Sequence, residues 1–307
     1  MARYILRRVV SMLITLWFVV TITFFLMHSI PGGPFDLNEK ALPPAVLEAL
    51  NEKYHLNDPL YKQYFDYLKG VATFELGPSF ARPGITVNQL IEQGFPVSAK
   101  LGGMAALVVI MVGIPIGIVS ALKQNKWQDY VVTVFATLGV AVPGFVLGTL
   151  IVYVFSARLD ILPAYGLESW KSYIGPVITL SGFSLAFVSR LTRSSLLEVM
   201  QQDYIRTARA KGLPELTVIF KHALKNSLIP VITYMGPMIA AIMTGSFVTE
   251  KIFAVPGMGR HFVESVGNRD YTVLLGTTIF YAAFAIFMIF LVDLAYGVID
   301  PRIKLGD

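Results

Sequence analysis

The feature that most restricts the fold of this chain is a series of long apolar runs, the first of which, residues 9–30, carries no formal charge. About 20 mostly apolar residues in a helix are enough to cross the hydrocarbon core of a bilayer. Hydrophobic residues make up 55% of the 307 residues. Charged residues make up only 15%, against roughly 25% in an average soluble domain. This composition argues against a disordered chain, a coiled coil or an ordinary soluble enzyme, and it predicts an integral membrane protein.

Six such runs predict an all-α membrane protein with six transmembrane helices. The first run follows Arg3, Arg7 and Arg8 and lacks a good cleavage site, so we interpret it as an uncleaved signal anchor. The other five spans are expected at about 97–122, 130–157, 173–189, 228–249 and 271–299. Gly and Pro recur inside them, as in Val142-Pro143-Gly144, which favours packing kinks between close helices over a gating hinge.

The distribution of charge predicts the orientation. With six spans both termini lie on one side of the membrane, and that side holds 14 of the 25 Lys and Arg residues, seven of them in the loop 190–227. Most of the 20 acidic residues fall on the other side. Because cytoplasmic loops are enriched in Lys and Arg, both termini are expected to be cytoplasmic.

The spans divide the chain into three parts: a tail and first helix (1–30), an outer loop (31–96) and a five-helix core (97–307). The outer loop is long enough for a small helical cap. Asp58-Pro59, an apolar stripe and then Gly70 predict one amphipathic helix, and 44–54 is a second candidate. Such a cap could receive a partner protein or rest on lipid with its aromatic side chains, and the residues alone favour neither.

The inner loop contains a short segment with a stop signal at each end. Asp203 stands where an N-cap belongs, Gly212 stands at the C′ position and Pro214 follows, so a short helix is expected between them. A second helix is expected over about 214–225. A rigid pair of helices suits docking to another protein, whereas a basic loop could also lie against anionic lipid headgroups.

At these residues the sequence resembles a known family. Arg206-Thr207-Ala208-Arg209-Ala210-Lys211-Gly212, followed by Leu213-Pro214 and His222-Ala-Leu-Lys-Asn226, is similar to the EAA loop of ATP-binding cassette importer permeases. Arg206 and Thr207 replace the Glu and the first Ala of the general pattern, and His222 and Lys225 replace its Ile and Pro. These departures look like the variant of the dipeptide, oligopeptide and nickel branch.

The resemblance extends over nearly the whole chain. Further similar stretches are 1–35 with Pro31-Gly-Gly-Pro34, 250–259, 268–271 and 292–302. The stretches 54–59, 77–80 and 95–101 resemble the B-type membrane subunit of bacterial oligopeptide permeases, within the binding-protein-dependent transport system inner membrane component family.

The resemblance implies a type I importer fold in a bacterial inner membrane, as a multi-pass protein. It implies half of a translocation path for oligopeptides, delivered by a periplasmic peptide-binding protein. A second, C-type permease subunit and two ATPase subunits would complete the complex, and the ATPases would bind ATP and Mg. The coupling loop would comprise Asp203, Arg206, Thr207, Ala208, Arg209, Ala210, Lys211, Gly212, Leu213 and Pro214. The alternatives are a permease for dipeptides, nickel or another small solute, and, from a different class, a proton-coupled secondary transporter.

Motifs for chemistry within the chain are missing. The sequence has no Gly-x-x-x-x-Gly-Lys-Ser/Thr phosphate loop, no His-Glu-x-x-His, no Gly-x-Ser-x-Gly and no cysteine. Its four histidines are far apart and show no metal-ligand spacing. We therefore expect no catalytic residue, metal, cofactor or nucleic-acid partner for this chain itself.

Two further features concern gating. The segment 251–271 is too polar to cross lipid and is expected to fold back over the outer mouth, with turns at Pro256, Gly257 and Gly259. Its charged residues Arg260, Glu264, Arg269 and Asp270 are candidates for contacting the binding protein or closing a gate. Asp293, inside the last span, is expected to make a packing or cytoplasmic-gate contact, with Arg190 or Arg193 as candidate partners, rather than to relay protons.

Overall fold

A computed structural model describes residues 2–30, 35 and 43–299. The Pro31–Pro34 motif and the end of the 292–302 motif lie outside these residues. Within them the regular structure is helical, apart from an isolated β-bridge between Pro78 and Thr86. The expected all-α class is therefore confirmed.

Contacts between residues divide the chain into two compact units. The first comprises Met1–Val97 and Pro256–Ile286, and the second comprises Ser98–Val255 and Phe287–Asp307. Helices α4 (Val87–Val108) and α15 (Tyr271–Ile299) contribute to both. These units cut across the predicted parts 31–96 and 97–307, because Glu264 and Asp270 bind the loop at 79–82.

The first unit contains α1 (Ala2–His28), α2 (Pro44–Lys53), α3 (Leu60–Ala72) and α14 (Met258–Gly267), with parts of α4 and α15. Phe24, Met27, Tyr271 and Leu275 form a buried cluster, against which aromatic residues of α3 pack. The predicted cap helices are present, with one correction. The amphipathic helix begins after Pro59 and continues through Gly70, where a Cβ would lie 2.6 Å from the Glu75 carbonyl oxygen. Gly70 thus permits a close return of the chain rather than ending the helix.

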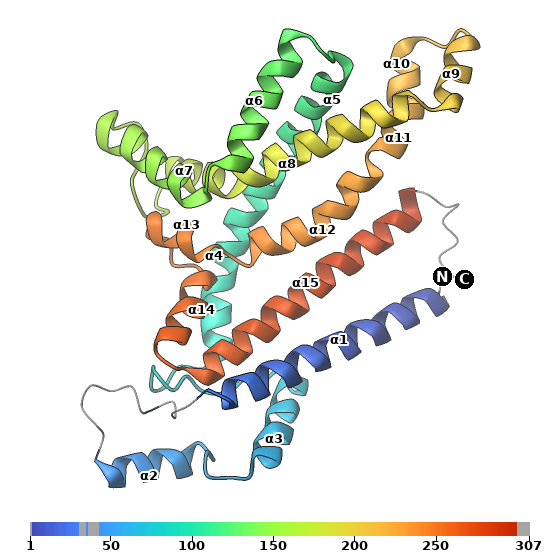
Figure 1. Ribbon diagram of the computed structural model, residues 1–307. Helices are drawn as coiled ribbons and strands as arrows, with labels where there is room; N and C mark the ends of the chain where they lie inside the picture. Colours follow the sequence, from blue (N-terminus) through green and yellow to red (C-terminus); the bar gives the residue numbers. More distant parts are fainter. Residues whose placement is uncertain (1, 31–34, 36–42, 300–307) are drawn as a thin grey trace. The chain divides into compact units, whose positions relative to one another are not determined.

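The second unit is built around α8 (Ile174–Met200), which packs against α5 (Ile114–Leu122), α6 (Trp127–Ala141), α7 (Gly144–Ile151) and α12 (Ile229–Met243) (Figure 1). The shorter helices are α9 (Asp203–Ala210), α10 (Glu215–Thr217), α11 (Leu224–Ser227) and α13 (Phe247–Ile252). π-Helical turns occupy Val109–Gly113, Val152–Arg158 and Val218–Ala223, and a 3₁₀ turn occupies Trp170–Tyr173.

The predicted spans are recovered with shifted ends. In the described chain five helical segments are long and apolar enough to cross a membrane: Ile5–His28, Val87–Leu122, Trp170–Met200, Ile229–Ile252 and Tyr271–Leu294. A sixth is possible if Trp127–Ala141 and Gly144–Arg158, bent by 103° relative to each other, form one span. The bend falls at Val142-Pro143, where the proline has no N–H to continue the helix. The sequence predicts one span over 130–157 with a kink at Val142-Pro143-Gly144, and the bend lies at that motif.

Glycine allows the helices of the second unit to pack closely. A Cβ on Gly102 would lie 2.5 Å from the Met243 Cα, and one on Gly117 would lie 2.6 Å from the Ser189 carbonyl oxygen. Real Cβ atoms do not approach backbone this closely, so only glycine fits at these crossings.

Candidate functional site

The short helix of the inner loop forms as the sequence predicts, shifted by one residue. Its N-cap is Gln202, whose backbone is extended, and Asp203 is its first residue. The Gln202 side chain makes no cap hydrogen bond, but the Asp203 carboxylate lies in the first turn, where the helix dipole favours negative charge. Arg206 Nη1 lies 3.5 Å from Asp203 Oδ1, and both side chains are exposed.

The end of α9 is a Schellman motif. Gly212 has φ +75° and its N–H donates to the Arg209 carbonyl over 2.9 Å, while the Leu213 N–H donates to the Ala208 carbonyl over 3.4 Å. Pro214 follows as the N-cap of α10. The predicted C′ role of Gly212 is thus confirmed, and it rests on backbone conformation because a Cβ at Gly212 would contact nothing within 4 Å.

One side of α9 is anchored in the second unit. Ile205 is fully buried and Ala208 is buried beside it, in a cluster with residues of α5, α8 and the helical run 215–227: Ala121, Leu196, Val218, Ile219, Ala223 and Leu224. Ala208, which we expected on the surface offered to a partner, is therefore a packing residue. The helical period places it three residues after Ile205 on the inner face.

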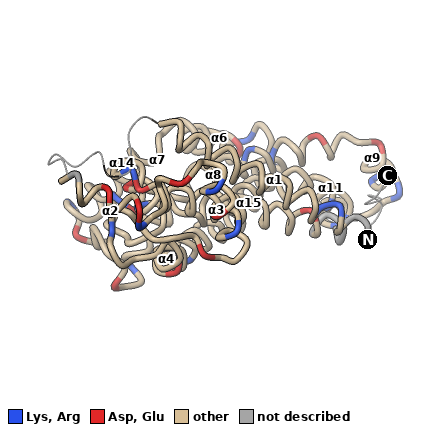
Figure 2. The backbone as a smooth tube through the Cα atoms, turned by 90° about the horizontal axis from the view of Figure 1, so that it is seen from below, with Lys and Arg blue, Asp and Glu red and all other residues tan. Residues whose placement is uncertain are grey.

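The other side of the inner loop is exposed and of mixed chemistry. Leu216 and Phe220 are 70% and 64% exposed, and Tyr204 and Leu213 are also exposed. The remaining residues predicted for the coupling loop lie on this exposed surface too: Thr207, Arg209, Ala210, Lys211 and Pro214. Figure 2 shows Lys and Arg residues along the chain at α9 and α11. Leu216 and Phe220 fall in the second predicted helix, about 214–225. The sequence prediction missed them because the coupling residues implied by the family resemblance end at Pro214.

Arg209 is held by an ion pair within the loop. Its guanidinium donates two hydrogen bonds, of 2.6 and 3.1 Å, to the Glu215 carboxylate. This hydrogen bonding lowers the pKa of Glu215 and raises the pKa of Arg209. The pair joins α9 to α10 across the glycine turn, so the two helices present one surface.

A buried polar cluster joins α5, α6 and α8. Asp129 on α6 is only 3% exposed and accepts hydrogen bonds from Arg193 Nε at 2.6 Å and Arg193 Nη2 at 2.8 Å. It also accepts from Ser120 Oγ at 2.6 Å and from the Asn125 N–H at 2.9 Å. These bonds tie α5, the turn after it and α6 to α8. Sequence reasoning counted Asp129 only as a loop charge, because its partner Arg193 is far away in the sequence.

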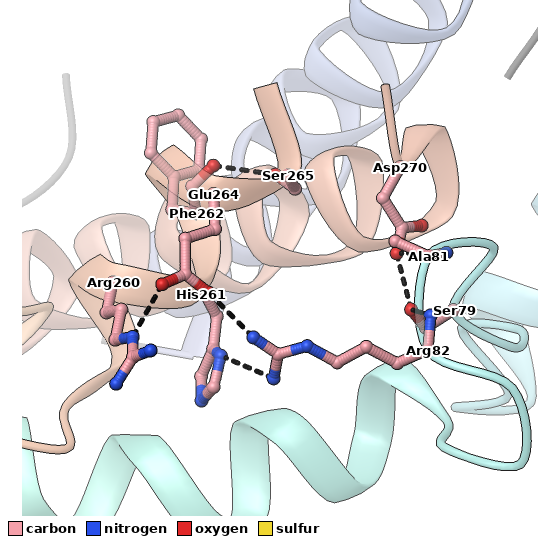
Figure 3. A network of polar contacts seen from close by, with 9 residues as sticks. All are labelled: Ser79, Ala81, Arg82, Arg260, His261, Phe262, Glu264, Ser265 and Asp270. Atoms are coloured by element: carbon pink, nitrogen blue, oxygen red, sulfur yellow. Dashed lines mark hydrogen bonds and ion pairs between the residues drawn. The ribbon is translucent and has the colours of Figure 1, made fainter. Parts of the chain in front are cut away.

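A second polar cluster, in the first unit, gathers some of the residues predicted for the outer gate. Figure 3 shows Arg82 reaching from the loop at 79–82 toward α14, where its Nη2 lies 2.7 Å from Glu264 and its Nη1 donates to His261 Nδ1 at 3.3 Å. Arg260 Nε also donates to Glu264, over 2.6 Å. Arg82 and His261 were not predicted, because neither belongs to a motif.

The ionisable groups of this outer cluster influence one another. Burial lowers the pKa of His261, and the neighbouring charge of Arg82 lowers it further. Burial alone would raise the pKa of Glu264, but the hydrogen bond from Arg260 and the nearby positive charges hold it below its usual value. At neutral pH the cluster therefore contains a neutral imidazole between charged groups.

Asp270 has a different role from the other predicted gate residues. It is buried and accepts hydrogen bonds from Ser79 Oγ and from the N–H groups of Phe80 and Ala81, both at 3.1 Å (Figure 3). Its carboxylate thus fixes the loop that carries Arg82, and it offers no surface to a partner in this conformation.

The remaining predicted gate residues take ordinary backbone positions. Pro256 and Gly257 precede α14, with Gly257 as its N-cap. Gly259 is buried inside α14, so the turn expected there is wrong. Arg269 has φ +50° in the short connection to α15.

The role of Asp293 stays a prediction. Of its two candidate partners, Arg193 hydrogen-bonds to Asp129 and Arg190 donates to Thr137 Oγ1 at 3.0 Å.

Among the residues that the structure describes, no three His, Asp or Glu side chains are grouped so as to hold a metal ion.

Comparison with known proteins shows that the sequence is similar to membrane components of transport systems. A family model of the binding-protein-dependent transport system inner membrane component matches residues 113–305, and the model of its N-terminal region matches residues 1–99. The dipeptide transport system permease protein DppB of Bacillus subtilis (strain 168) is 48% identical over 99% of both chains. The oligopeptide transport system permease protein OppB of Salmonella typhimurium is 47% identical over 99% of this chain and 100% of its own length.

Solved structures show the same fold at lower identity. The crystal structure of an amino acid ABC transporter with histidines matches with a TM-score of 0.55 and 15% identity, over 68% of this chain and 93% of that chain. An inward-facing MetNI methionine ABC transporter matches with a TM-score of 0.53 and 15% identity, over 71% and 97% of the two chains. The fold is therefore that of type I importer permeases.

Proposed function

Because the chain belongs to the family of binding-protein-dependent transport system inner membrane components, we propose that it forms half of the translocation path of an ATP-driven peptide importer. Two relatives of nearly equal identity are named as dipeptide and oligopeptide permeases, which supports short peptides as the substrate class. Oligopeptides, expected from the sequence, belong to this class.

The observation that carries the proposal is the exposed surface of the inner loop. Leu213, Leu216 and Phe220 lie outside the candidate spans, so lipid tails do not account for their exposure. An exposed apolar patch with a basic rim is typical of a protein-binding surface. We assign it as the docking surface for an ATPase subunit, with α9 as the coupling helix.

The other subunits of the proposed complex are those that the family resemblance implies. ATP and Mg would bind to two ATPase subunits, because this sequence has no phosphate loop. A second, C-type permease would complete the path and a periplasmic peptide-binding protein would deliver the substrate. In this arrangement both termini and the inner loop are cytoplasmic, in a bacterial inner membrane.

Reconstitution tests this proposal directly. The chain is placed in vesicles with a second permease, two ATPases and a binding protein, and uptake of a labelled peptide is followed with and without ATP. We expect uptake that needs ATP and every subunit, and no accumulation of nickel in the same vesicles. Peptide uptake by the chain alone, driven by a pH gradient, would instead indicate a secondary transporter.

Gly212 tests the coupling assignment separately. A β-branched residue in the left-handed region costs about 1–2 kcal/mol, whereas asparagine tolerates it. Gly212→Val should therefore disfavour the observed end of α9 by a factor of about 5–30, and reduce peptide uptake per ATP hydrolysed. Gly212→Asn should retain most of the coupling. Equal coupling in both variants would contradict a role for this turn while leaving the transport assignment intact.

A further inference from the structure

A groove in the second unit lies between α4 and the start of α8. Its volume is about 470 Å³. Apolar side chains line its length, namely Met104, Val108, Ile174, Val177 and Ile178, and Lys100, Trp170 and Tyr173 line it as well. Among the described lining residues Lys100 alone carries a charge.

The polar and aromatic residues gather at one end of this groove. Lys100 Nζ donates to the Tyr173 hydroxyl over 2.9 Å and lies 4.5 Å from the centre of its ring. Trp170 is 72% exposed at the beginning of the same helical run. Lys, Trp and Tyr at the end of a span are typical of the membrane interface, where an aromatic body and a polar tip meet lipid and water.

The groove extends from that end along α4. Met104 and Val108 follow Lys100 at one and two helical turns, so the apolar part extends about 12 Å along α4. The span Val87–Leu122 is longer than a bilayer core. Counting about 20 residues back from Leu122 puts the edge of the hydrocarbon core near Lys100. The ammonium therefore lies at headgroup depth and the apolar lining lies at acyl-chain depth.

The face of α8 that lines the groove is suited to lipid. Phe183 follows Ile174 by nine residues, and Phe187 follows Ile178 by nine residues. Nine residues are two and a half helical turns, so each phenylalanine, exposed or half-buried, lies on the opposite side of α8 from the isoleucine. Exposed Arg190 shares that opposite side. Arg190 donates a hydrogen bond to Thr137 of α6, so that side of α8 contacts another helix of the second unit. On the groove side Ile178 is 45% exposed, which suits contact with lipid tails.

We propose that this groove binds an anionic phospholipid, with one acyl chain along Met104, Val108, Val177 and Ile178 and the headgroup phosphate on Lys100. An ammonium has three donors, and Tyr173 accepts only one of them, so two remain for phosphate oxygens. A lipid held there would fill the space between α4 and α8 and hold the outer end of α8 in place.

Photocrosslinking tests the lipid assignment on the complete transporter. The purified complex is reconstituted with phosphatidylglycerol that carries a diazirine on one acyl chain, or with the matched phosphatidylcholine, and the labelled peptides are identified by mass spectrometry. We expect adducts on α4 and α8 at the groove, with more label from phosphatidylglycerol. Labelling of α1, whose Leu13 and Phe18 are exposed, serves as the reference for bulk lipid.

Three variants separate a bound lipid from general exposure. Lys100→Gln should reduce groove labelling by phosphatidylglycerol about fivefold, as expected for one interfacial lysine. Met104→Trp, which fills the groove, should reduce labelling by both lipids. Lys171→Gln removes an exposed lysine that does not line the groove, and it should change nothing.

Several results would overturn the lipid site. Equal labelling by the two lipids, or an unchanged level in Lys100→Gln, would refute the phosphate contact. Absence of label from the groove peptides while α1 is labelled would mean that a helix of a partner subunit occupies the groove. Each of these outcomes leaves the transport function untouched, since the assay measures lipid contact alone.

Discussion

The buried ion pair between Asp129 and Arg193 gives the sharpest prediction about stability. Asp129→Asn preserves the size of the side chain but replaces one acceptor oxygen by an NH₂ group facing donors. Asp129 is the acceptor in all four of its hydrogen bonds. In the Asn variant at least one of these N–H or O–H groups must therefore face the amide NH₂, which is itself a donor. The Arg193 charge would also lose its partner.

The expected magnitude follows from burial. Removing one member of a buried ion pair costs about 3–5 kcal/mol. The Arg193 side chain is 28% exposed, so water can partly solvate it and the lower end, about 3 kcal/mol, is expected. With an unfolding entropy of about 2.1 cal/mol/K per residue, a 307-residue chain would melt about 5 °C lower.

Thermal unfolding of the purified complex measures this effect, and two further variants make it specific. Asp129→Leu with Arg193→Met removes both charges and should recover most of the loss, because an apolar replacement of a whole buried pair is often near neutral. Arg190→Met, on the same helix, removes an exposed arginine and should have little effect. The reasoning is refuted if Asp129→Asn melts like the wild type, or if the double variant loses the sum of the two single losses.

The remaining predictions concern helix packing and acid sensitivity. Gly102→Ala places a Cβ against the backbone of α12 and should cost about 1–3 kcal/mol by melting, whereas Gly103→Ala, with no atom within 4 Å, should cost almost nothing. The folded-state pKa of His261 lies below 6.5, so its contribution to stability is complete above that pH and is lost as the pH falls through the folded value. His261→Gln should remove this first loss in a series of melts between pH 7.5 and 5. The hydrogen bond from Arg260 and the nearby charges, Arg82 among them, hold the pKa of Glu264 below 4.5, so this stabilisation is complete above pH 4.5 and is lost at lower pH. In melts extended to about pH 3, Glu264→Gln should abolish this second loss and enlarge the first, because the Glu264 charge no longer raises the pKa of His261.

The sequence predicts the membrane helices well because their signal is local. The last helix spans the predicted residues, Tyr271–Ile299, and the end of α9 at Gly212 follows from the glycine-proline pattern. Where a helix begins in polar sequence, its predicted first residue lies too far along the chain. Helix α4 begins at Val87 rather than 97, because its first turns belong to the outer loop in composition but continue the same helix.

The polar clusters could not be predicted from the sequence, because their residues are far apart along the chain. Arg193 meets Asp129 and Arg82 meets Glu264 only after the helices have packed. Neither pair has a spacing that could indicate it beforehand. The bend at Val142-Pro143 is a partial case, since proline indicates a break but its angle depends on packing against other helices.

The contacts of α9 determine how a push from an ATPase would travel. Ile205 packs in one apolar cluster with Leu196 of α8 and Ala121 of α5, while Asp129 fastens α6 to α8 one turn further along. At Gly117 the backbones of α5 and α8 are so close that no side chain fits between them. Packed interfaces of this kind move as bodies or switch between arrangements rather than deform continuously. If α9 is displaced, we therefore expect α5, α6 and α8 to move together with it as one body, and we do not expect the loop 203–227 to absorb the displacement by deforming.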